Sequence, residues 1–136
     1  MKKTLILAAL LVAMLMPVSA WAAVCSVAEG NNVNVSWTNP PEPDLSTVQI
    51  YRGTTTEFSD ALQIGEVDYT KTTYVDANVE DGVYFYFLTA KDGRWPNCEL
   101  PDGSSPPVNI SAPSAPSNAV LVDTTPPSPP SDVHAG

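Results

Sequence analysis

Few residues of this chain are of the types that do catalytic chemistry. His134 is the only histidine, and it lies in a proline-rich stretch near the C-terminus. A nucleophile activated by histidine needs that histidine beside it within the fold, so we expect no such triad. The 15 acidic residues include many conceivable pairs for glycoside hydrolysis, but their spacing singles out none. The sequence therefore predicts that the chain is not an enzyme, and an unrecognised carboxylate pair is the remaining catalytic alternative.

A short acidic pattern resembles the start of a calcium-binding loop. Asp76, Asn78 and Glu80 alternate along the chain as ligands do in such loops. The helix-flanked calcium loop also needs Gly at its sixth position and Glu at its twelfth. Counted from Asp76, these positions hold Asp81 and Phe87. We therefore expect a plain turn between strands, with no metal and no cofactor.

Residues 1–22 have the pattern of a secretory signal of bacterial style. Lys2 and Lys3 form a short positive region, an apolar run follows, and a small-x-small motif ends at Ala22. The apolar run is shorter than the roughly 18 residues of a membrane span. We expect cleavage after Ala20 or Ala22. The protein is then exported to the periplasm, the cell surface or the medium, without membrane contact after cleavage.

Cys25 and Cys98 are the only cysteines. Export places them in an oxidising compartment, where such a pair usually forms a disulfide. Their spacing does not match the redox motif with two intervening residues. A disulfide closing so long a loop would stabilise the fold by roughly 4 kcal/mol in the chain-entropy model. We expect this disulfide, and two free thiols are the alternative.

The chain is acidic, with a formal net charge of −9. Removing a signal that contains Lys2 and Lys3 makes the mature protein still more negative. Nucleic acids and anionic membranes bind positively charged surfaces. A nucleic-acid partner is therefore not expected.

Beyond residue 24 the chain alternates in the manner of β-strands. Period-two alternation with many β-branched and aromatic residues predicts strands, and turn signals separate them. We find no internal repeat. Short strands with frequent turns predict an all-β, immunoglobulin-like antiparallel β-sandwich of about seven strands. The expected strands lie within 24–30, 32–38, 46–53, 61–67, 72–79, 81–93 and 118–123.

Four aromatic residues stand in a row in the sixth of these segments. Alternation places Tyr84 and Tyr86 on one face and Phe85 and Phe87 on the other. We expect the tyrosines to fill the core between the sheets, and the phenylalanines to need some other cover. An aromatic platform for a ligand is the alternative.

The order and spacing of these segments resemble a fibronectin type III domain of the bacterial secreted kind. The matching pieces are VNVSWTNPPEPD, VQIYRGTT, VEDGVYFYFLTAKD and SAPSNAVLVDTTPPSPP. The resemblance implies that Trp37 is the core tryptophan. It also implies that Tyr84 is the tyrosine-corner residue, with its ring packed inward and its hydroxyl bonded to backbone just upstream.

The same resemblance implies a domain over residues 23–123. A proline-rich linker, or the start of a following domain, then covers residues 124–136. The first strand of this fold starts at the end where the loop between the sixth and seventh strands lies. Cys25 and Cys98 would therefore meet without distorting the sheets.

The long loop from Lys91 to Ser105 is the expected contact for a partner. It carries Arg94, Trp95 and Leu100, and an exposed tryptophan beside an arginine is a common interface anchor. We expect an exported, non-catalytic interaction or spacer module within a larger assembly, with a protein partner. A carbohydrate-binding module that uses Trp95 is the alternative function. Trp95 packed over the disulfide or the phenylalanines is the structural alternative.

Overall fold

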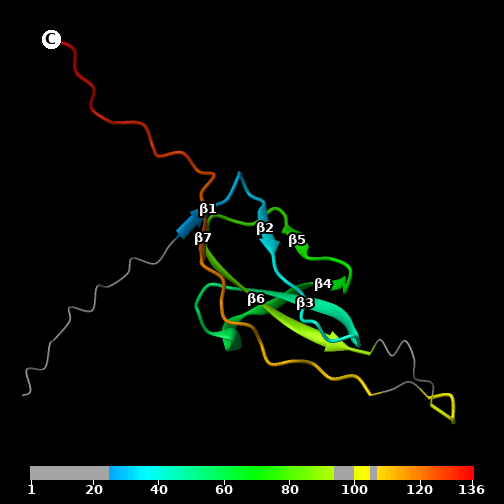
Figure 1. Ribbon diagram of the computed structural model, residues 1–136. Coiled ribbons are helices and arrows are strands. Elements are labelled where there is room, and N and C mark those ends of the chain that lie inside the picture. Colours follow the sequence, from blue (N-terminus) through cyan, green and yellow to red (C-terminus); the bar gives the residue numbers. More distant parts are fainter. Residues whose placement is uncertain (1–24, 94–99, 105–106) are drawn as a thin grey trace, which may run out of the picture.

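A computed structural model describes residues 25–93, 100–104 and 107–136 of the chain (Figure 1). The described part is all-β, as the alternation predicts. Its strands are β1 (Cys25–Val27), β2 (Val33–Ser36), β3 (Leu45–Gly53), β4 (Leu62–Asp68), β5 (Thr73–Asp76), β6 (Gly82–Asp92) and β7 (Ala119–Val122). One turn of 3₁₀-helix, η1 (Phe58–Asp60), connects β3 to β4. Within these residues, no helix has the length and apolar character needed to cross a membrane.

The strands form two sheets that share a hydrophobic core. The larger sheet has the order β1-β7-β6-β3-β4, and β2 pairs with β5 in the smaller one. All pairs are antiparallel except β1 with β7, which is parallel. Both sheets supply the buried cluster of Val33, Ile50, Val79, Tyr86, Val120 and Val122.

Strand β6 separates its aromatic residues between two faces, as predicted. Tyr86 is buried in the core between the sheets, and Tyr84 packs against that core. Phe87 lies on the outer face, yet it is only 1% exposed. Its cover is Phe58 of η1, whose ring meets Phe87 edge-on at 5.6 Å and Tyr51 at 4.9 Å. The outer face therefore carries an aromatic cluster of its own under a short helical turn.

A bulge in β4 ties the two sheets together at their far edge. Ile50 pairs with Gly65 and Tyr51 pairs with Gln63, so Ile64 is the extra residue. The Tyr74 hydroxyl of β5 donates to the carbonyl oxygen of Ile64 at 2.9 Å. A Cβ on Gly65 would lie 2.6 Å from the Tyr74 ring, so the ring needs a glycine there.

Residues 109–117, here called the serine strap, cover the edge of β6 that β7 does not reach. The strap contains the run SAPSAPS, so the prediction of no internal repeat is wrong at this short period. Ser111, Ser114 and Ser117 each donate a backbone N–H to a β6 carbonyl, at 2.8–2.9 Å. Each of these serines also accepts a β6 N–H on its side-chain Oγ, at 2.9–3.0 Å.

Proline explains why side chains replace backbone in this pairing. A proline has no N–H and cannot continue a regular ladder. The repeat therefore places one serine opposite every second residue of β6, where its N–H and its hydroxyl satisfy the carbonyl and the amide of the same residue. The strap covers this edge of β6, and its prolines keep it from presenting a regular row of unpaired backbone N–H groups.

Candidate functional site

The sequence-predicted contact loop, residues 91–105, falls partly outside the described residues. Arg94, Trp95 and Cys98 are among the residues that the structure does not describe, so their roles stay predictions. Leu100 is half-buried, and its carbonyl accepts the Gly103 N–H at 3.0 Å in a turn.

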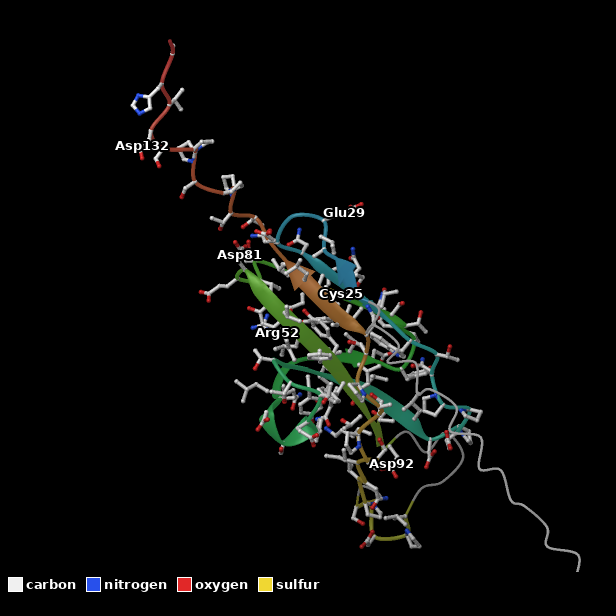
Figure 2. All side chains as sticks on the ribbon, turned by 90° about the vertical axis from the view of Figure 1, so that its left-hand side faces the viewer. Cys25, Glu29, Arg52, Asp81, Asp92 and Asp132 are labelled. Carbon is white, nitrogen blue, oxygen red and sulfur yellow. The ribbon has the colours of Figure 1, made fainter. Side chains whose placement is uncertain are left out.

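Cys25 lies away from the place where the contact loop begins. Its side chain is exposed at the start of β1, and its register partner is Ala119, the first residue of β7. Since Val120 pairs with Tyr84, Cys25 lies level with Phe85, in the first half of β6. The predicted loop begins at Lys91, and β6 ends at Asp92, at the far end of that strand. Cys25 and Asp92 are labelled in Figure 2, whereas Cys98 lies outside the described residues, so the meeting of the cysteines stays a prediction.

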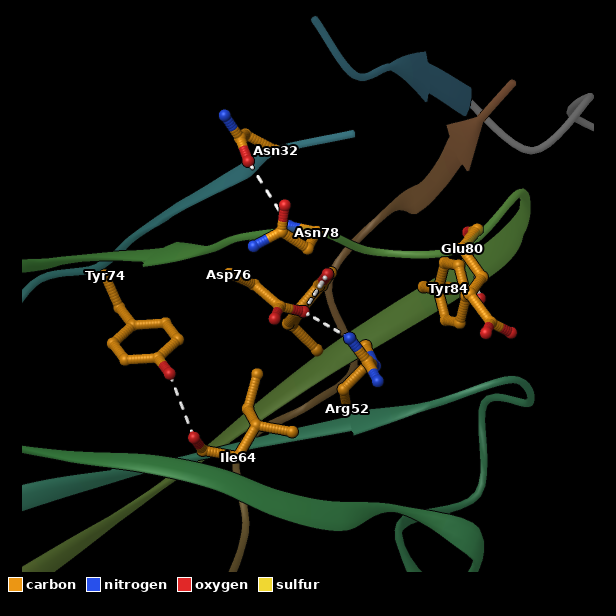
Figure 3. A network of polar contacts seen from close by, with 9 residues as sticks. Asn32, Arg52, Ile64, Tyr74, Asp76, Asn78, Glu80 and Tyr84 are labelled. Carbon is orange, nitrogen blue, oxygen red and sulfur yellow. Dashed lines mark hydrogen bonds and ion pairs between the residues drawn. The ribbon is translucent and has the colours of Figure 1, made fainter. Parts of the chain in front are cut away.

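The main polar cluster in the core converges on one carboxylate, that of Asp76 in β5 (Figure 3). Its Oδ2 accepts the Tyr86 hydroxyl at 2.9 Å and pairs with Arg52 Nη1 at 2.8 Å. Tyr86 and Arg52 belong to the larger sheet, so this single oxygen bridges the two sheets. The Asp76 side chain is only 10% exposed, while that of Arg52 is 31% exposed. The residue first considered as a calcium ligand is thus an acceptor that links the sheets.

Arg52 also contacts the tyrosine that the resemblance singled out. Its guanidinium lies 5.2 Å from the centre of the Tyr84 ring, within range of a cation–π contact. The Tyr84 hydroxyl donates to the carbonyl oxygen of Glu80 at 3.1 Å. The expected bond to backbone just upstream is present.

The electrostatics of this cluster favour a fixed structure. Burial raises the pKa of Tyr86, and the hydrogen bond to Asp76 raises it further, so the hydroxyl stays a donor. Burial alone would lower the pKa of Arg52, but the hydrogen bond and charge of Asp76 outweigh it and raise that pKa. Tyr86 is held protonated and Arg52 charged, and neither is tuned to exchange protons near neutral pH.

A groove runs between the serine strap and the turn after β2, and we call it the Trp37 groove. Trp37 was expected in the core, but it is only partly buried, and it packs against the core from the groove wall. The groove encloses about 360 Å³ beside Trp37 and continues into a second hollow of about 280 Å³. Both hollows are lined by Pro40, Ala90 and Ser111.

The groove has an apolar floor and an acidic end. Val48, Leu88 and Ala90 lie along it, and Ala112 lies on the strap side. The Trp37 indole N–H is already bonded to Asn39 Oδ1 at 2.7 Å, so the ring offers mainly apolar surface.

Glu42, Asp44 and Asp92 line the second hollow. Hydrogen bonds from the backbone and then the side chain of Asn109 lower the pKa of Asp92. That carboxylate is therefore charged at neutral pH. The arrangement suits an extended apolar segment with a positive charge at one end.

Sequence reasoning missed this groove. Its walls come from residues 37–45 and 109–114, which only the fold brings together. The Ser-Ala-Pro repeat was the available signal, because a period of three with regular prolines is foreign to a strand.

Comparison with known proteins gives little similarity. No protein-family model and no curated protein matches the chain. Among solved structures, the chain is similar to a pectate lyase from Pectobacterium carotovorum, with 18% identity and a TM-score of 0.45. The match covers 77% of this chain and 28% of that protein, so the chain spans under a third of the structure it resembles.

This finding overturns one expectation. The sequence predicts that the chain is not an enzyme, whereas the similar structure is that of a lyase. We therefore withdraw the exclusion of enzymatic activity. At this identity and TM-score the likeness assigns no reaction or substrate to the chain.

Proposed function

We propose that the chain is an exported module with a fibronectin type III-like β-sandwich, and that it serves for interaction or spacing within a larger assembly. Two sheets with a shared core support the sandwich. The bond from Tyr84 to the Glu80 carbonyl supports the tyrosine corner. Export rests on the signal-like pattern of residues 1–22.

The Trp37 groove is the observation that carries the interaction role. A groove with an aromatic wall, an apolar floor and a few polar groups at one end is typical of a binding surface. Its acidic end favours a protein segment in which Lys or Arg follows apolar residues. The predicted contact loop, residues 91–105, includes Asp92 of the groove lining, so the two candidate surfaces meet there.

Two exposed alanines of the strap provide a matched test. Ala112 lines the groove, while Ala115 holds the same place in the next repeat and is absent from the groove lining. Both are exposed. Ala112→Arg adds bulk and positive charge at the groove, and Ala115→Arg adds the same charge outside it. The exported wild type and both variants are used to capture partners from the native cell envelope, and the captured proteins are quantified.

The expected partner is retained by Ala115→Arg and weakened at least about tenfold by Ala112→Arg, the equivalent of about 1.4 kcal/mol. Equal retention by both variants would rule out the groove as the contact. Trp95→Ala is measured in parallel, because a loss there of about 2 kcal/mol or more would assign the contact to the loop. Binding to a glycan array that is lost with Trp95→Ala would instead favour the carbohydrate-binding alternative.

A further inference from the structure

The proline-rich C-terminal segment is tied to the sheets by one carboxylate, that of Asp81. This residue lies in the turn between β5 and β6, beside the point where the chain leaves β7 (Figure 2). Its Oδ1 accepts both the backbone N–H of Thr124 at 2.9 Å and the Thr124 hydroxyl at 2.7 Å. Its Oδ2 accepts the hydroxyl of Thr125. Three donors on two adjacent residues therefore meet one exposed side chain.

The residues on either side of this contact leave little freedom. Val122 is fully buried and pairs with Gly82. Beyond the threonines the sequence reads Pro-Pro-Ser-Pro-Pro, from Pro126 to Pro130. Each proline fixes its own φ and restricts the residue before it to extended conformations. Thr125 is thus restricted both by the following proline and by Asp81.

We infer that Asp81 sets the direction in which the arm of residues 123–130 leaves the sheets, so that the arm is a stiff spacer rather than a flexible tether. Eight residues at about 3.1 Å each extend it by roughly 25 Å. Whatever follows Pro130 is then presented at a set distance and angle, away from the groove. The use of the arm as a spacer rests on the proposed function, whereas its stiffness rests on the contacts of Asp81 and on the prolines that follow.

The Asp81 carboxylate is ionised over the usual range of pH. The hydroxyl of Thr125 and then the donors of Thr124 lower the pKa of Asp81 to about 2. The carboxylate is therefore ionised, and able to accept all three hydrogen bonds, wherever an exported protein works.

Backbone NMR on the mature full chain tests the inference. Heteronuclear NOEs and residual dipolar couplings are measured for Thr124, Thr125 and Ser128 in the wild type and in Asp81→Ala. Asp123→Ala is the matched control, because it removes an exposed carboxylate from the arm itself. Thr124→Val with Thr125→Val removes the two hydroxyl donors without touching the turn. Melting curves of all variants report on the fold.

In the wild type we expect the threonines to have NOEs near those of β7 and couplings that fit the alignment of the sheets. In Asp81→Ala their NOEs should fall to those of residues 132–136, and the Thr124 amide should exchange at least about tenfold faster. The double valine variant should shift in the same direction, and Asp123→Ala should match the wild type. Threonines that are already mobile in the wild type, or unchanged in Asp81→Ala, would overturn the inference. Partner capture is a separate measurement, so failure of the interaction role would leave this result unaffected.

Discussion

Asp76 shows how the role of a single residue depends on partners that are distant in sequence. Its carboxylate holds Arg52, 24 positions earlier, and Tyr86, 10 positions later. Both donors bind the same oxygen, Oδ2, across the space between the sheets. From sequence, Asp76 was only the first of three alternating polar residues. The pairing of β2 with β5 turns its side chain toward the core.

Removing that carboxylate should strongly destabilise the fold. Asp76→Ala leaves the Tyr86 hydroxyl and the Arg52 guanidinium without their acceptor. We expect a loss of about 2–4 kcal/mol in the free energy of unfolding. This lies below the upper end for broken buried ion pairs because the Arg52 side chain is 31% exposed. Urea melts measure the loss. Tyr86→Phe removes one donor only and should cost about 0.5–1.5 kcal/mol.

The control for this prediction is Glu80→Ala. Glu80 is an exposed acidic residue in the turn after β5, and the carbonyl that accepts the Tyr84 hydroxyl is backbone and survives the change. Its melting curve should match that of the wild type. An Asp76→Ala variant as stable as Glu80→Ala would show that the bridge between the sheets contributes no net stability.

At the scale of elements, alternation predicted most of what forms. Each of the seven expected segments overlaps a strand, and the division of β6 into an inner and an outer face is confirmed. Period-two patterns are local, so one sequence suffices to find them. The cover over Phe87 was not predictable in this way. It depends on Phe58, 29 positions away, in a turn that has no pattern of its own.

The serine strap makes a prediction at this scale. Ser114→Ala removes the side-chain acceptor of the Leu88 N–H and leaves the backbone bond of residue 114 in place. We expect a loss of about 0.5–1.5 kcal/mol and faster hydrogen exchange at the Leu88 amide. Ser128→Ala, in the proline-rich arm, is the matched control and should change neither. Unchanged hydrogen exchange at the Leu88 amide would mean that the Ser114 hydroxyl does not protect this edge of β6.

Gly65 makes a second prediction for an element, the bulged strand β4. An added Cβ would lie 2.6 Å from the Tyr74 ring, so Gly65→Ala should destabilise by about 1–3 kcal/mol through overpacking. The same substitution in a Tyr74→Ala background should have little effect, because the obstructing ring is gone. A double-mutant cycle from urea melts gives the coupling. Additive effects would contradict the contact.

At the scale of the whole molecule, the sequence predicted the class of fold but not the contacts between distant segments. The pairing of β1 with β7, the groove beside Trp37 and the hold of Asp81 on the arm all join residues far apart in the chain. Nothing local encodes such contacts, since each side has an ordinary composition. The predicted contact loop also shows this limit. Its residues were selected for their side-chain types, whereas the groove beside it exists only because the fold brings distant segments together.

The last prediction concerns the cysteine pair, and it depends on the length of the segment between Asp92 and Cys98. From the strand registers, Cys25 lies level with Phe85, seven residues before Asp92 and two strands across. At about 3.3 Å per residue and about 4.8 Å per strand, the Cα atoms of Cys25 and Asp92 are roughly 25 Å apart. The six residues from Gly93 to Cys98 reach at most about 22 Å, and a disulfide adds about 5.5 Å between Cα atoms. The pair can therefore close only with that segment almost fully extended.

We expect the disulfide, because the proposed export would place both cysteines in an oxidising compartment and the sequence contains no third cysteine. Mass spectrometry of non-reduced peptides should detect the linked pair. Deleting Pro96 and Asn97 shortens the reach by about 7 Å and should leave two thiols that can be alkylated, while the sheets still form. The duplication of Asn97 is the control, since a longer segment should still close. Two free thiols in the native exported protein would contradict the disulfide. A linked pair in the deletion variant would instead show that Cys25 lies closer to Asp92 than the strand registers place it.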